Sequence, residues 1–89
     1  MTKQDKLIRR LLSQPKDFTW AELVRLLNSL GYQLDRKGKT SGSRVAFWRQ
    51  GYPPINLHRP HPGNVLKSYQ IRQVSEILRN LGLLAEEEQ

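Results

Sequence analysis

Two histidines and an arginine gather in one short segment of this 89-residue chain. His58 and His61 stand three positions apart with Arg59 between them, and Pro60 and Pro62 flank His61. Cleavage of RNA needs a base for the 2′-hydroxyl proton, an acid for the leaving 5′-oxygen and a cation beside the phosphate. Histidine suits both proton roles because its unperturbed pKa is about 6.5. The segment predicts this chemistry; the alternative is a loop whose histidines only hydrogen-bond or contact phosphate.

The same histidines do not predict a metal site. Their spacing suits zinc, but two ligands are too few for a structural site, and the chain has no cysteine. The nearest acidic residues, Asp35 and Glu76, are far from both histidines in the sequence. We therefore expect no metal and no cofactor. The lack of cysteine also excludes a disulfide framework and fits a cytoplasmic protein, as does the lack of a long apolar run.

The charge distribution indicates a polyanionic partner. The chain has 15 Lys and Arg residues against 8 acidic ones. No acidic residue lies between Asp35 and Glu76, whereas that region carries Arg36, Lys37, Lys39, Arg44, Arg49, Arg59, Lys67 and Arg72. A phosphate backbone is the commonest partner of such a region, because each neutralised phosphate releases condensed counterions. A basic surface that only aids solubility is the alternative; a membrane is disfavoured, since the charge does not follow one amphipathic helix.

A basic glycine-serine stretch over residues 37–43 resembles only the end of a nucleotide-binding loop. It contains Gly38-Lys39-Thr40, but it lacks the first glycine of a Walker A motif and leads into a predicted strand rather than a helix. We therefore reject ATP binding and interpret the stretch as a basic loop that contacts phosphates.

Apolar residues at helical spacing predict three helices. The first covers about residues 3–13. The second follows a capping box formed by Thr19 and Glu22. The third covers about residues 69–81, with Ser68 as its N-cap.

Alternating apolar and polar residues predict three strands, over residues 32–36, 44–49 and 55–58. The order α-α-β-β-β-α indicates an α+β fold in which helices cover one face of a three-stranded antiparallel sheet. The other face of that sheet would present Arg44, Ala46, Trp48, Asn56 and His58.

Several segments together have an order and spacing typical of one protein family. They are Glu22–Leu27, Leu30–Tyr32, Gly42–Phe47, His61–Gly63, Leu66–Lys67, Ile71–Arg72 and Val74. In these segments the chain resembles the HicA toxins of HicAB toxin–antitoxin systems over about residues 19–84. Residues 1–17 then look like a helical extension, 18–84 like the HicA-like domain, and 85–89 like an acidic tail.

The resemblance implies a double-stranded-RNA-binding-like α-β-β-β-α fold and a metal-independent endoribonuclease that cuts messenger RNA. It also implies a HicB antitoxin that masks the active face. The family's catalytic histidine follows Gly-Ser at the start of the second strand, where this chain has Arg44. Arginine stays protonated and cannot act as a general base. Three interpretations stay open: the role moved to His58 or His61, the chain binds RNA but cuts poorly, or it is a binding module that never cut RNA.

We assign proton transfer to His61 and His58, and phosphate binding to Arg44, Arg59 and Lys67. The residues that would extend the RNA-binding surface are Lys37, Lys39, Arg49 and Arg72. Trp48 would stack on an unpaired base; alternatively, the N-terminal helix or a partner protein covers it. A competing class is a protein-interaction module whose basic face docks an acidic partner such as the antitoxin.

Overall fold

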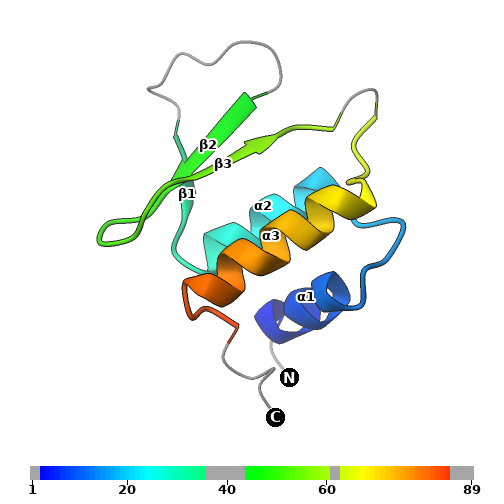
Figure 1. Cartoon of the computed structure of the whole chain (residues 1–89), viewed down its shortest axis with the longest axis horizontal. Coiled ribbons are helices and arrows are strands. Elements are labelled where there is room, and N and C mark those ends of the chain that lie inside the picture. The colour runs from blue at the N-terminus through cyan, green and yellow to red at the C-terminus, as the bar shows by residue number, and fades with distance from the viewer. Residues whose placement is uncertain (1–2, 36–43, 61–62, 85–89) are drawn as a thin grey trace.

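The computed structural model describes residues 3–35, 44–60 and 63–84 (Figure 1). Its elements are α1 (Lys3–Leu12), α2 (Trp20–Ser29), β1 (Gln33–Leu34), β2 (Arg44–Trp48), β3 (Ile55–His58) and α3 (Ser68–Asn80). The strands pair antiparallel in the order β1-β2-β3. The predicted α+β fold, with three helices and a three-stranded antiparallel sheet, is confirmed.

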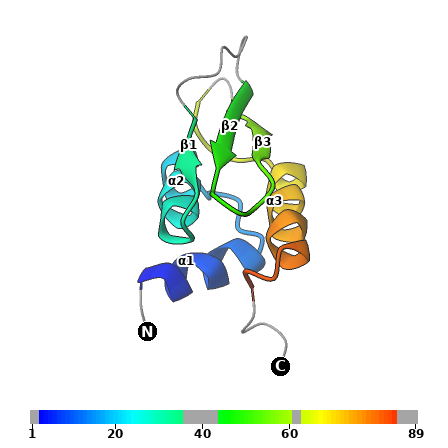
Figure 2. The ribbon, with the colours of Figure 1, turned by 90° about the vertical axis from the view of Figure 1, so that its left-hand side faces the viewer.

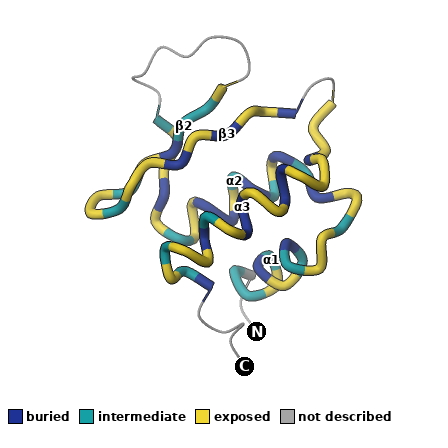
Figure 3. Tube along the Cα trace, in the orientation of Figure 1, coloured by how far each residue is buried: buried dark blue, intermediate teal, exposed yellow. Residues whose placement is uncertain are grey.

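The molecule is built in three layers. Figure 2 shows α2 near β1 and α3 near β3, with α1 beyond both helices on the side away from the sheet. Burial alternates along β3 (Figure 3): Ile55 and Leu57 are buried in the core, and Asn56 and His58 are exposed. Ile8 and Leu11 of α1 are buried in the same core cluster as the apolar residues of α2, α3 and the sheet. The N-terminal segment therefore contributes to the core, and the outer face of the sheet stays open.

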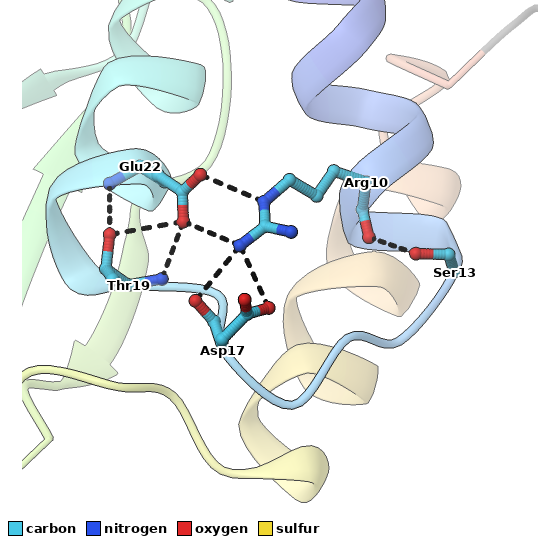
Figure 4. Close-up of polar contacts among 5 residues, drawn as sticks. All are labelled: Arg10, Ser13, Asp17, Thr19 and Glu22. Atoms are coloured by element: carbon cyan, nitrogen blue, oxygen red, sulfur yellow. Dashed lines mark hydrogen bonds and ion pairs between the residues drawn. The ribbon is translucent and has the colours of Figure 1, made fainter.

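The start of α2 joins α1 through a network of polar contacts (Figure 4). Thr19 Oγ1 accepts a hydrogen bond from the Glu22 amide at 3.2 Å, and Glu22 Oε1 accepts one from the Thr19 amide at 2.9 Å. The predicted capping box is thus confirmed. Arg10 of α1 extends it, donating from Nε to Glu22 Oε2 at 2.9 Å and from Nη2 to Asp17 at 3.0 Å.

We expect Glu22→Gln to lower the free energy of unfolding at pH 7 by about 1 kcal/mol, because it removes the ion pair with Arg10. The Arg10 hydrogen bond, followed by the Thr19 amide, holds the pKa of Glu22 below its ordinary value of 4.5. A lowered folded-state pKa gives stability that is complete above the unfolded pKa and lost as the pH falls through the folded one. The difference between wild type and variant should therefore shrink below about pH 4.

Urea unfolding at pH 7 and pH 3 measures this difference. Glu76→Gln, which changes an exposed carboxylate on α3, is the matched control and should stay within about 0.5 kcal/mol of wild type. An equal destabilisation by Glu22→Gln at both pH values would contradict the ion-pair account.

The strand after α2 is shorter than the predicted range 32–36, because Tyr32 belongs to the turn that closes the helix. Its amide donates to Leu27 O at 2.9 Å, and its Oη donates to Pro53 O at 2.8 Å. The ring is fully buried, and this burial raises the pKa of the Tyr32 hydroxyl. Arg36 lies outside the described residues.

The prediction that Ser68 caps the third helix is wrong by one position. Ser68 is the first helical residue, and Lys67 occupies the N-cap. The Lys67 amide donates to Gln70 Oε1 at 2.9 Å, so glutamine supplies half of a capping box. Serine is a common N-cap residue and lysine is not, so N-cap preferences predicted Ser68 as the cap.

Candidate functional site

The outer face of the sheet brings together an arginine and a histidine from different strands. Arg44 begins β2, His58 ends β3, and the antiparallel register sets them opposite each other. Opposed residues in a sheet have Cβ atoms about 4.5–5.5 Å apart. Both residues are exposed, as the alternation predicts, whereas the next pair in the register, Val45 and Leu57, lies against the core. A guanidinium and an imidazole are thus presented together to solvent.

This pair suits an anionic substrate whose reaction needs proton transfer. The Arg44 guanidinium is a permanent cation with paired donors that match two phosphate oxygens. Histidine is the side chain that enzymes use most often as a general acid or base, and His58 supplies an imidazole here. Arg44 can therefore hold a phosphate while His58 gives or takes a proton at a neighbouring oxygen. These two chemical roles stay predictions.

Gln70 of α3 ties the end of β3 to the start of α3. Its Nε2 donates to the His58 carbonyl at 2.8 Å, and its Oε1 accepts from the Lys67 amide at 2.9 Å. The residue is only 6% exposed, and both hydrogen bonds are partly buried. One buried amide therefore fixes the backbone at both His58 and Lys67, which bracket the segment that carries His61. The sequence assignment missed Gln70; a glutamine three residues after Lys67 was the available signal.

The segment between β3 and α3 is also tied to the start of α2. The Trp20 amide donates to Asn64 O at 2.7 Å, and the Leu66 amide donates to Phe18 O at 2.8 Å. Arg59 and Lys67, predicted to bind phosphate, are exposed near the two ends of this segment. His61, predicted for proton transfer, lies outside the described residues, as do Lys37 and Lys39.

Two of the arginines predicted to bind RNA, Arg49 and Arg72, have surroundings that differ from those of the exposed Arg44–His58 pair. Arg49 is partly buried: its Nη1 donates to Leu30 O at 2.8 Å, and its guanidinium lies 4.0 Å from the centre of the Tyr52 ring. These contacts give Arg49 a structural role that the sequence did not indicate.

Arg72 lies on α3 beside a hollow of about 450 Å³ that Leu12 of α1 also lines, away from the sheet. The structure therefore does not bring Arg72 to Arg44 and His58.

Trp48, at the end of β2, lies on the outer face with 49% of its surface exposed. Helix α1 packs on the far side of α2 and α3, so the alternative that the N-terminal helix covers Trp48 is wrong (Figure 2). Trp20, by contrast, is buried in the core, with its ring centre 5.9 Å from that of Phe47. The tryptophan left open to solvent shares its face with Arg44 and His58.

Neither a metal cluster nor a membrane span occurs in the described part of the chain. No group of three or more histidine, cysteine, aspartate or glutamate side chains there could hold a metal ion. No helix within residues 3–35, 44–60 and 63–84 is long and apolar enough to cross a membrane.

Comparison with known proteins gives one family. The model of a family described as the HicA toxin of bacterial toxin–antitoxin systems matches residues 20–83, from the first residue of α2 to just beyond α3. No curated protein and no solved structure matches the chain. The matched region contains the whole sheet, Arg44, His58 and Gln70.

Proposed function

The chain belongs to the HicA toxin family of bacterial toxin–antitoxin systems, and we propose that it is an endoribonuclease that cuts messenger RNA in the cytoplasm without a metal ion. The observation that carries this proposal is the exposed pair Arg44 and His58, set opposite each other on an open sheet face. The long region without acidic residues supports it, because a basic surface attracts the phosphate backbone.

In the proposed reaction the 2′-oxygen of one ribose bonds to the adjacent phosphorus, and the bond from phosphorus to the 5′-oxygen breaks. One histidine takes the 2′-hydroxyl proton, and the other gives a proton to the leaving 5′-oxygen; His58 and His61 fill these two roles. Arg44 and Arg59 hold the phosphate oxygens as negative charge grows on them. The products are a 2′,3′-cyclic phosphate and a 5′-hydroxyl, so protons and bonds balance without a cofactor.

Other parts of the chain would extend the RNA contact. Lys67 lies at the N-terminus of α3, where backbone amides and the helix dipole also favour an anion. Lys37 and Lys39 precede β2 in the sequence and would also contact phosphates. We propose that a HicB-type antitoxin covers the same open face, because a protein on Arg44 and His58 would exclude RNA.

A second candidate function is RNA binding without cleavage. Arg44 favours it, because this residue stands where the HicA resemblance places the catalytic histidine. A chain of this kind would bind RNA through the same face and leave it intact, so binding and cleavage need separate measurements.

Arg44→Ala tests whether RNA lies on this face. With single-stranded 2′-O-methyl RNA, which lacks the attacking hydroxyl, we expect weaker binding and a log–log salt slope reduced by about 0.7, the contribution of one phosphate contact. Arg9→Ala removes another exposed arginine, from α1 on the far side of the molecule, and should leave the slope unchanged. Unaltered affinity and slope for Arg44→Ala would show that RNA binds elsewhere. Ordinary RNA that is bound but never cut would favour the second candidate.

A further inference from the structure

A shallow hollow lies beside Trp48 on the outer face of the sheet. It encloses about 300 Å³ and is lined by Gly31, Gln33, Trp48, Arg49 and Gln50. We propose that it holds one unpaired nucleobase of the bound RNA, stacked on the Trp48 indole, with the Gln33 and Gln50 amides at the edge of the base. This inference rests on the proposed function and adds that the substrate is single-stranded where it crosses this hollow.

The position of Trp48 makes it available to a ligand. Its neighbour Phe47 is fully buried on the helix side, so Trp48 points the opposite way, and 49% of its surface is exposed. Gln33 lies directly opposite Trp48 in the pairing of β1 with β2, which sets an amide beside the indole. The indole has no ring contact and no hydrogen bond with another residue of the described segments. A large flat ring next to amide donors and acceptors suits a base, which offers a π-face and a polar edge.

The rim of the hollow is held in place by Arg49. Its guanidinium is fixed between Leu30 O and the Tyr52 ring, so it supplies an ordered positive charge. Gly31 allows the Arg49 side chain to lie close to the backbone. A Cβ at this position would lie 3.0 Å from Arg49 Nε, and the backbone has φ +94°. The hollow is therefore a preorganised feature of the turn after α2, and its cation favours the anionic backbone of RNA over a neutral ligand.

The distance to the Arg44–His58 pair fits a continuous strand of RNA. Trp48 lies four residues after Arg44 on the same face of β2, about 13 Å at the usual rise per strand residue. A strand whose scissile phosphate sits at Arg44 would reach Trp48 within a few nucleotides. Paired RNA could not use the hollow, because its bases are stacked within the helix.

Binding of uncleavable single-stranded 2′-O-methyl RNA to Trp48→Ala and Trp48→Phe tests the proposal. We expect Trp48→Ala to lose about fivefold to a hundredfold in affinity, the usual effect of one stacked base, and Trp48→Phe to keep most of the binding. The bases of the RNA are also removed one at a time. At one position the removal should weaken wild-type binding as much as Trp48→Ala does, and at that position it should not weaken the binding of Trp48→Ala any further. Tyr69→Ala, which removes an even more exposed aromatic ring from α3, is the matched control and should bind as wild type does.

Thermal melts of all the variants show whether each is folded. If Trp48→Ala binds like wild type while Arg44→Ala binds weakly, the base subsite is wrong, but the proposal that RNA binds the outer face of the sheet is supported. The subsite is equally wrong if the affinity lost in Trp48→Ala does not depend on any one base, or if Trp48→Ala weakens only antitoxin binding. If wild type does not bind the RNA, both the subsite and the proposed function are overturned.

Discussion

His58→Ala is expected to slow the cleavage of messenger RNA about a hundredfold to ten-thousandfold, the usual contribution of one acid or base. The side chain is exposed at the end of β3, so its removal should leave the fold and RNA affinity nearly unchanged. His61→Ala should show a loss of the same order, because the reaction needs both an acid and a base. Single-turnover cleavage of labelled RNA measures the rate, and binding of 2′-O-methyl RNA measures the affinity.

Two comparisons make this result specific. Asn56→Ala changes an exposed residue on the same face of β3 and should cleave within a few-fold of wild type. Arg44→His places a histidine where the family resemblance expects one. A faster Arg44→His combined with an unaffected His58→Ala would contradict our assignment and mark the chain as a variant with a lost catalytic histidine.

Gln70→Leu is expected to have the second large effect, on both stability and cleavage. It removes the bonds to the His58 carbonyl and the Lys67 amide. Unmade hydrogen bonds of buried groups cost about 1–3 kcal/mol each, and water can reach these strand and helix ends, so we expect a loss of about 2 kcal/mol. Cleavage should fall further than RNA affinity, because the segment that carries His61 loses the tie between its two ends.

Urea unfolding and single-turnover cleavage, measured well below the melting temperature, test this prediction. Gln73→Leu is the matched control, since Gln73 is an exposed glutamine on the same helix, and it should stay within about 0.5 kcal/mol of wild type. A Gln70→Leu chain as stable and as active as wild type would contradict the positioning role of Gln70.

The sequence predicts this fold well wherever local pattern decides the structure. The limits of β3 follow from alternating apolar residues between Pro54 and Pro60, and the structure has them at Ile55 and His58. The start of α2 follows from the pairing of Thr19 with Glu22, which are three residues apart. In both cases the residues that decide the element are neighbours in the sequence.

Contacts between distant segments could not be predicted in the same way. The structural role of Arg49 depends on its hydrogen bond to Leu30 O, 19 residues away in the sequence, which no local pattern indicates. Arg10 meets Glu22 only because α1 packs across α2. The sequence does not decide whether Trp48 is exposed or covered, since no local rule says on which side of α2 and α3 the first helix lies.

The candidate site was predictable in part. Alternation within β2 and β3 puts Arg44 and His58 on one face, and the turn between the strands then makes them register partners. Gln70 was missed because lysine is not a usual N-cap, so the capping-box spacing from Lys67 to Gln70 did not stand out in the sequence. His61 lies outside the described residues, and its assignment rests on its residue type, its spacing from His58 and the prolines that flank it.

Cleavage of an end-labelled messenger RNA by the purified chain in excess EDTA is the most direct test of the central claim. Our account predicts discrete fragments ending in 2′,3′-cyclic phosphates, formed at the same rate with and without EDTA and lost in His58→Ala and His61→Ala. RNA that stays intact while bound to the wild-type chain would contradict the assignment of a nuclease. Cutting that EDTA abolishes would contradict the metal-independent mechanism.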